Sequence, residues 1–155
     1  MIAIKKILFP TDFSNCAKTA QDYAWALTEQ FQAELHVLHV LADVMMMMPE
    51  PGSALSLPQN YLVDLKTEAA RMLDKVLPDA ARSGRKIVRA VRMGNPFAEI
   101  VKYADEEEID LIVVGTHGRG ALAHMLMGGV SEKVVRKANC PVLSVRPAGH
   151  HFVTP

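Results

Sequence analysis

The sequence has little of what would assign a function at first sight. Its 155 residues include two cysteines, Cys16 and Cys140, whose separation fits no metal-ligand motif, so both are expected to be packing residues. Seventeen basic residues balance seventeen acidic ones, which disfavours a nucleic acid or an anionic membrane as a partner. The apolar run at the N-terminus is short and broken by Lys5, Lys6 and Pro10, so it resembles neither a secretory signal nor a membrane span. We therefore expect a cytoplasmic protein.

The best-known catalytic and phosphate-binding motifs are also missing. No G-x-x-x-x-G-K-[ST] sequence occurs, which excludes a P-loop NTPase. Residues 118–123 formally match the dinucleotide motif G-x-G-x-x-A, but no acid follows at the end of the next predicted strand, so a dinucleotide is disfavoured. No set of nucleophile, base and acid can be assembled from the sequence, so we assign no catalytic residue. We also assign no residue as a metal ligand. His36 and His39 are expected to be structural.

The apolar pattern predicts one domain at residues 1–147, with a C-terminal tail at residues 148–155. Five short runs rich in Val, Ile and Leu predict buried parallel strands at residues 5–9, 35–41, 86–91, 111–114 and Val142–Val145. Apolar residues with helical spacing lie between these runs and predict four helices. Strict alternation of strand and helix predicts an α/β fold with an open, Rossmann-like, five-stranded sheet that carries helices on both faces.

The ligand crevice of such a sheet lies beyond the carboxyl ends of its strands, and a glycine-rich stretch, residues 115–131, follows the fourth predicted strand. Glycines let an anion approach the backbone, and a helix N-terminus adds N–H donors and a favourable dipole. The stretch therefore predicts a phosphate site, built from Gly115, His117, Gly118, Arg119, Gly128, Gly129, Val130 and Ser131. The alternative is that the glycines only permit a tight turn and the start of a helix, and that His117 only orients the loop.

Two other segments follow predicted strands. Asp12 comes after the first strand, where its carboxylate can accept hydrogen bonds from ribose hydroxyls or cap the next helix, a role that Ser14 could also fill. Gly94 comes after the third. A long loop at residues 42–58 holds four consecutive methionines and is expected to be an apolar flap, a lid or a partner surface. Basic residues in the centre of the chain are expected to serve solvation only, namely Arg71, Arg82, Arg85, Lys86, Arg89 and Arg92.

Taken together, five segments carry a family pattern: KKILFPTDFSNCA, ELHVLHV, DLIVVGTHGRG, GGVSEKVV and CPVLSVRP. In this order and spacing, residues 5–146 resemble the universal stress protein family. The resemblance implies a domain like that of the adenine nucleotide alpha hydrolases. It also implies an ATP-binding motif G-x2-G-x9-G-[S/T/N] on Gly115, Gly118 and Gly128. It further implies that Asp12 binds the ribose, and that Pro10, Thr11 and Val40 surround the adenosine.

The resemblance also implies a homodimer that pairs through Val142–Val145, and a divalent ion, Mg²⁺ or Mn²⁺, bound through the phosphates. One residue departs from the pattern, because Gly129 stands where a small polar residue is expected. A neutral hydrogen bond contributes about 0.5–1.5 kcal/mol net, so binding should persist while the choice among ATP, ADP and AMP stays open. The leading hypothesis is a nucleotide-binding stress-response regulator with an unidentified protein partner. The alternatives are a slow ATPase and a nucleotide-free interaction module.

Overall fold

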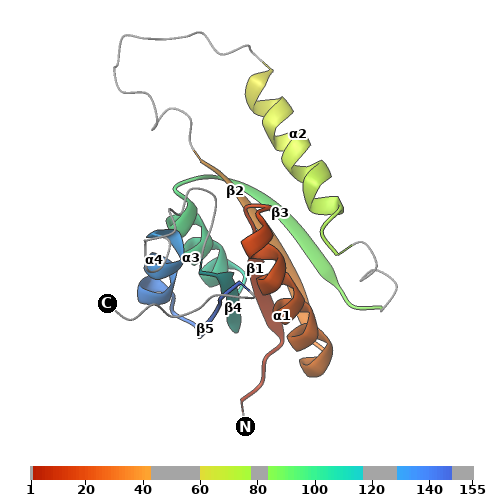
Figure 1. Cartoon of the computed structure of the whole chain (residues 1–155), viewed down its shortest axis with the longest axis vertical. Helices are drawn as coiled ribbons and strands as arrows, with labels where there is room; N and C mark the ends of the chain where they lie inside the picture. The colour runs from red at the N-terminus through yellow and green to blue at the C-terminus, as the bar shows by residue number, and fades with distance from the viewer. Residues whose placement is uncertain (1, 43–59, 78–83, 117–128, 148–155) are drawn as a thin grey trace.

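Strands and helices alternate along the chain in the computed structural model, which describes residues 2–42, 60–77, 84–116 and 129–147. Within these ranges the strands are β1 (Lys6–Pro10), β2 (Glu34–Ala42), β3 (Ile87–Gly94), β4 (Leu111–Gly115) and β5 (Val142–Val145). The helices are α1 (Asn15–Phe31), α2 (Tyr61–Asp74), α3 (Pro96–Glu106) and α4 (Gly129–Lys137) (Figure 1). The predicted alternation is confirmed. β3 runs three residues further than predicted, and the other predicted strand bounds lie within one residue of those observed.

All neighbouring strands are parallel, in the order β3-β2-β1-β4-β5. The chain winds from β1 outward to β3, then returns to the other side of β1 and continues to β5. The winding therefore reverses between β1 and β4, and the ladder between these two strands ends at Leu8 and Ile112. An open α/β sheet binds ligands beyond the carboxyl ends of the strands at such a reversal. The topology thus directs attention to the segments that follow β1 and β4.

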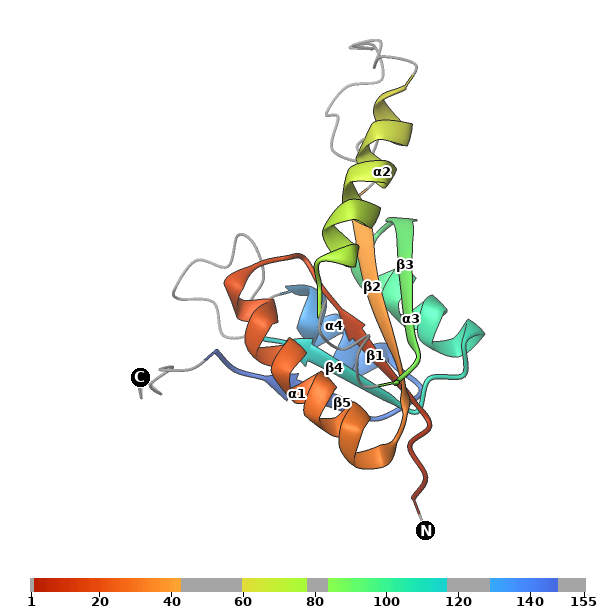
Figure 2. The same ribbon diagram turned by 90° about the vertical axis from the view of Figure 1, so that its right-hand side faces the viewer.

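Each face of the sheet is covered by one pair of helices, as the two views show (Figures 1 and 2). Side chains alternate along a strand, so Ile7 and Phe9 belong to the core under α1 and α2, while Leu8 belongs to the core under α3 and α4. Burial on both faces explains the consecutive apolar residues of β1 and β4. The Rossmann-like fold with helices on both faces is confirmed.

One of the basic residues assigned to solvation has a structural role instead. The Arg89 side chain on β3 donates from Nε to the carbonyl of Leu73 at 3.0 Å and from Nη2 to that of Val76 at 2.9 Å. The Leu73 carbonyl lies in the last turn of α2 and also accepts the N–H of Val76 at 3.0 Å, and the Val76 carbonyl lies beyond the end of the helix. Arg89 therefore fastens the end of α2 to the sheet, a contact that a count of basic residues cannot reveal.

Among the described residues, no helix combines the length and the apolar character needed to cross a membrane.

Candidate functional site

The turn after β1 is held by its own short hydrogen bonds and by β2. Thr11 is buried, and its N–H donates to the carbonyl of Leu38 at 2.9 Å. The N–H of Phe13 donates to Thr11 Oγ1 at 3.0 Å, and that of Ser14 to Asp12 Oδ1 at 2.9 Å. The turn therefore presents the Asp12 carboxylate in a fixed orientation, directly beyond the carboxyl end of a central strand.

Ser14, and not Asp12, caps the first helix. Ser14 has an extended backbone, and its Oγ accepts the N–H of Ala17 at 3.3 Å. This is the usual geometry of an N-cap serine. Ser14 therefore fills the capping role that was the alternative for Asp12. Asp12 supports the turn by accepting the N–H of Ser14.

Phe13 and His39 belong to the surroundings of this turn, although the sequence did not mark either as part of a site. Phe13 adopts a left-handed backbone conformation, with φ of 62°, and its ring lies 4.4 Å from that of His39 between centroids. The Nδ1 of His39 in turn lies 2.7 Å from the carbonyl oxygen of Thr11. The only sequence signal was the position of His39 beside Val40, near the end of the second strand. His39 is structural, as predicted, and its partner is the turn that carries Asp12.

Gly115, the last residue of β4, lies against the first turn of α1. A Cβ added to Gly115 would lie 3.2 Å from the carbonyl oxygen of Cys16 and 3.7 Å from the Cα of Ala17. Both are backbone atoms, which cannot move aside as the end of a side chain can. Close packing of α1 over the end of β4 therefore requires a residue without a side chain here, whatever Gly115 contributes to a ligand.

The last helix starts beside the end of β4. α4 begins at Gly129, and an added Cβ there would meet no atom of the described residues within 4 Å. Val130 is exposed, whereas Ser131 is buried and its Oγ donates to the carbonyl of Gly115 at 2.6 Å. Ser131 was predicted to donate to a phosphate, but in this structure its hydroxyl ties α4 to β4. The backbone N–H groups of the first turn have no partner within the helix, so they are the donors that α4 can offer to an anion.

A groove of about 540 Å³ opens beside the same turn. Thr11, Phe13 and Ser14 line one side of it, and residues of α2 such as Glu68 and Met72 line the other. Sites for small ligands commonly have volumes of roughly 300–1,000 Å³. The groove lies between α1 and α2, and Asp12 is not among the residues that line it, so it is distinct from the space beyond the carboxyl ends of β1 and β4.

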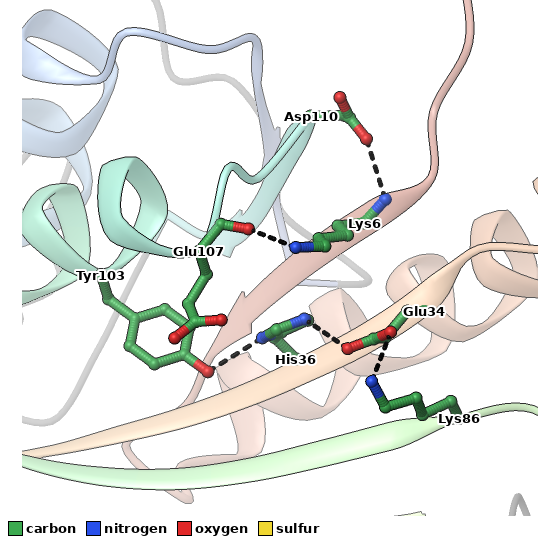
Figure 3. Close-up of polar contacts among 7 residues, drawn as sticks. All are labelled: Lys6, Glu34, His36, Lys86, Tyr103, Glu107 and Asp110. Carbon is green, nitrogen blue, oxygen red and sulfur yellow. Dashed lines mark hydrogen bonds and ion pairs between the residues drawn. The ribbon is translucent and has the colours of Figure 1, made fainter.

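The other end of the sheet carries a polar cluster that belongs to the fold and not to this site (Figure 3). His36 is buried, with Nδ1 2.9 Å from the Tyr103 hydroxyl and Nε2 3.0 Å from Glu34 Oε1. The second contact lacks the alignment of a hydrogen bond. Lys86 pairs with Glu34 at 2.9 Å and keeps the pKa of that carboxyl below its ordinary value. Burial raises the pKa of Tyr103 to about 12 and lowers that of His36.

The lowered pKa of His36 predicts acid sensitivity of the fold. Burial opposes protonation in the folded chain, so as pH falls below the ordinary histidine value of about 6.5 the unfolded chain takes up the proton first. The free energy of unfolding should then fall with pH, beginning near that value. We expect His36→Gln to have a flatter profile than the wild type between pH 7.5 and 5.5 in urea titrations. Parallel profiles for the two proteins would contradict this assignment.

A match to the model of the universal stress protein family spans residues 3–146 of the chain. The chain belongs to the universal stress protein family. The universal stress protein MJ0531 of Methanocaldococcus jannaschii is 36% identical over 143 residues, which cover 92% of this chain and 82% of that protein. The solved structure of MJ0577 from the same organism is 32% identical, with a TM-score of 0.83 over 96% of this chain and 100% of that one.

One further family structure is a universal stress protein in complex with cAMP. It is 26% identical to this chain, with a TM-score of 0.68, and the match covers 92% of this chain and 97% of that one. At least one member of the family thus binds an adenine nucleotide.

The remaining residues predicted for the site lie on three different strands or outside the described ranges. Pro10 is buried at the end of β1, and Val40 on β2 packs against the core under α3 and α4. Gly94 ends the edge strand β3, two strands away from β1. Its φ is 145°, and a Cβ added to it would lie 3.1 Å from Glu99 Cγ. The local backbone and packing therefore favour glycine at this position. The loop residues lie outside the described ranges, namely His117, Gly118, Arg119, Gly128 and the methionines at 45–48.

Residues 2–42, 60–77, 84–116 and 129–147 contain no group of three His, Cys, Asp or Glu side chains arranged to hold a metal ion.

Proposed function

We propose that this universal stress protein binds an adenine nucleotide across the carboxyl ends of β1 and β4. Asp12 accepts hydrogen bonds from the ribose, and the phosphates lie at the N-terminus of α4. The observation that carries this proposal is the placement of an oriented carboxylate after β1 and a helix N-terminus after β4, on the two strands where the winding reverses. A ribose needs an acceptor and a phosphate needs N–H donors, and the two strands supply one of each.

The cAMP complex of a relative supports an adenine nucleotide as the ligand. Family resemblance adds Pro10, Thr11 and Val40 around the adenosine, and Gly118 and Gly128 beside Gly115 in the glycine motif. Any Mg²⁺ or Mn²⁺ in this proposal binds through the phosphates. Calorimetric titration with ATP, ADP and AMP tests it, and we expect binding of at least one of them. Absence of heat and of competition for all three would instead favour a nucleotide-free interaction module.

Gly129 sets the expected preference among the nucleotides. Its backbone N–H remains available, but the hydroxyl or amide that the family motif places here is missing. Since an added Cβ meets no atom within 4 Å in the part of the chain that the structure describes, Gly129→Ser should fold normally and supply that donor. We expect it to tighten ATP binding roughly 2- to 12-fold, the equivalent of one neutral hydrogen bond, with little change for AMP. Gly129→Ala is the matched control without a hydroxyl, and an equal gain in that variant would argue against the interpretation.

We also propose a homodimer that pairs through β5. β5 lies at the edge of the sheet, and Val142 and Leu143 on it are only half-buried. An edge strand exposes unpaired backbone groups that a second copy can satisfy. Light scattering should therefore report twice the chain mass of 17.0 kDa, and a monomer across the micromolar range would contradict the proposal.

The biological role proposed for this site is regulatory. Occupancy by the nucleotide would alter a surface that an unidentified protein partner binds, within the cytoplasm. Hydrolysis is not part of the proposal, and a slow ATPase remains the alternative.

A further inference from the structure

The turn that carries Asp12 is anchored to β2 by both backbone groups of Thr11. The N–H of Thr11 donates to the carbonyl of Leu38 at 2.9 Å, and its carbonyl oxygen lies 2.7 Å from His39 Nδ1. A carbonyl oxygen can only accept, so Nδ1 of His39 must carry the hydrogen. The bond is therefore available in the Nδ1–H tautomer and also in the protonated ring. His39 thus fixes Thr11 from the side chain, in addition to the ordinary ladder.

The residue on the other side of Asp12 contacts the same histidine. Phe13 holds a backbone φ of 62°, a conformation that is unfavourable for a bulky side chain and persists only where the surroundings enforce it. Its ring packs against the His39 ring, with 4.4 Å between centroids and 36° between planes. The N–H of Phe13 also donates to Thr11 Oγ1 at 3.0 Å. His39 therefore supports both neighbours of Asp12.

Asp12 itself is oriented within this frame by the N–H of Ser14, which donates to Oδ1 at 2.9 Å. A carboxylate offers about four lone-pair sites, so this bond directs the group without exhausting its capacity as an acceptor. Bonds to two adjacent hydroxyls require the carboxylate to be placed to within about 0.5 Å. The contacts that hold the turn should therefore decide how well the carboxylate distinguishes a ribose from a sugar that lacks one hydroxyl.

We propose that His39 is a positioning residue, and that by holding the Thr11–Phe13 backbone around Asp12 it makes this site select ribonucleotides over 2′-deoxyribonucleotides. The inference rests on the proposed function and deepens it. His39 does not contact the ligand in this account. Its effect reaches the sugar only through Asp12, so its loss should weaken binding of the ribonucleotide and leave binding of the 2′-deoxyribonucleotide unchanged.

Two substitutions of similar polarity separate this role from general support of the fold. The side-chain amide nitrogen of asparagine can take the place of His39 Nδ1, whereas that of glutamine reaches closer to the place of Nε2. His39→Asn should therefore keep the bond to the Thr11 carbonyl, and His39→Gln should lose it. The full chain and both variants are titrated calorimetrically with ATP and with 2′-deoxyATP, after thermal unfolding has shown that each is folded.

We expect the wild type to bind ATP roughly 10- to 100-fold more tightly than 2′-deoxyATP, as for one hydrogen bond to a charged acceptor. His39→Gln should lower this ratio to about threefold or less by weakening ATP alone, while His39→Asn retains most of it. In an Asp12→Ala background the His39→Gln change should have no further effect on the ratio, because sites that act in series are not additive.

An unchanged ratio in His39→Gln, or equal weakening of both nucleotides, would overturn the role of His39 while leaving the nucleotide site intact. A wild type that binds both nucleotides equally would overturn ribose selection. A wild type that binds neither would overturn the proposed function itself, which is a separate outcome.

Discussion

Replacement of Asp12 by alanine is expected to weaken binding of the adenine nucleotide by roughly 10- to 100-fold, because each hydrogen bond to a charged acceptor contributes about 1.5–3 kcal/mol. The variant should remain folded. The variant loses the bond from the Ser14 N–H at 2.9 Å, while Ser14 itself still caps α1. Calorimetry with ATP gives the change in Kd, and urea titration gives the change in the free energy of unfolding.

The matched control is Asp22→Ala, which removes an equal charge from an exposed position on α1. It should leave the affinity unchanged, so a loss confined to Asp12→Ala cannot be an effect of net charge. If Asp12→Ala bound ATP as tightly as the wild type, the ribose would have to lie elsewhere.

Replacement of Gly115 by valine is expected to have the largest effect on stability among the residues of the site. Even a Cβ would lie 3.2 Å from the carbonyl oxygen of Cys16, and the two further methyl groups of valine have to displace the backbone of α1. Overpacking of this kind costs about 1–3 kcal/mol. The loss should be visible as a lower urea midpoint. Nucleotide binding should fall as well, because α1 and the turn with Asp12 move together.

Gly129 provides the control for this effect. Among residues 2–42, 60–77, 84–116 and 129–147, no atom lies within 4 Å of a Cβ at Gly129, so Gly129→Ala should leave the urea midpoint close to that of the wild type. The comparison contradicts the packing argument if Gly115→Val is as stable as Gly129→Ala.

Much of the fold could be predicted because buried parallel strands leave a simple mark on the sequence. β1 and β4 each hold at least three consecutive buried apolar residues, since helices cover both faces of the sheet. β3 was predicted too short because Arg92 and Gly94 break its apolar character, although the pairing with β2 continues to Gly94. The strand order was beyond reach, because alternation of strands and helices does not say on which side of β1 the chain returns.

Site residues could be predicted where their role depends on their position along the chain. They could not be predicted where their role depends on contacts between segments that are distant in the sequence. Asp12 and Gly115 follow strands, so the topology of an α/β sheet marks them in advance. The contacts of His39 with the turn after β1, of Ser131 with Gly115 and of Arg89 with the end of α2 depend on how distant segments pack. A single sequence carries no signal of such packing. From the sequence, His39 was therefore interpreted as a structural residue within a strand, Ser131 as a phosphate donor and Arg89 as a solvated side chain.

A crystal structure of the full chain grown with ATP tests the central claim most directly. The account predicts nucleotide density with the ribose within hydrogen-bonding distance of the Asp12 carboxylate and the phosphates at the N-terminus of α4, beside Gly129. Nucleotide density confined to the groove between α1 and α2, or no nucleotide density at saturating ATP, would contradict it.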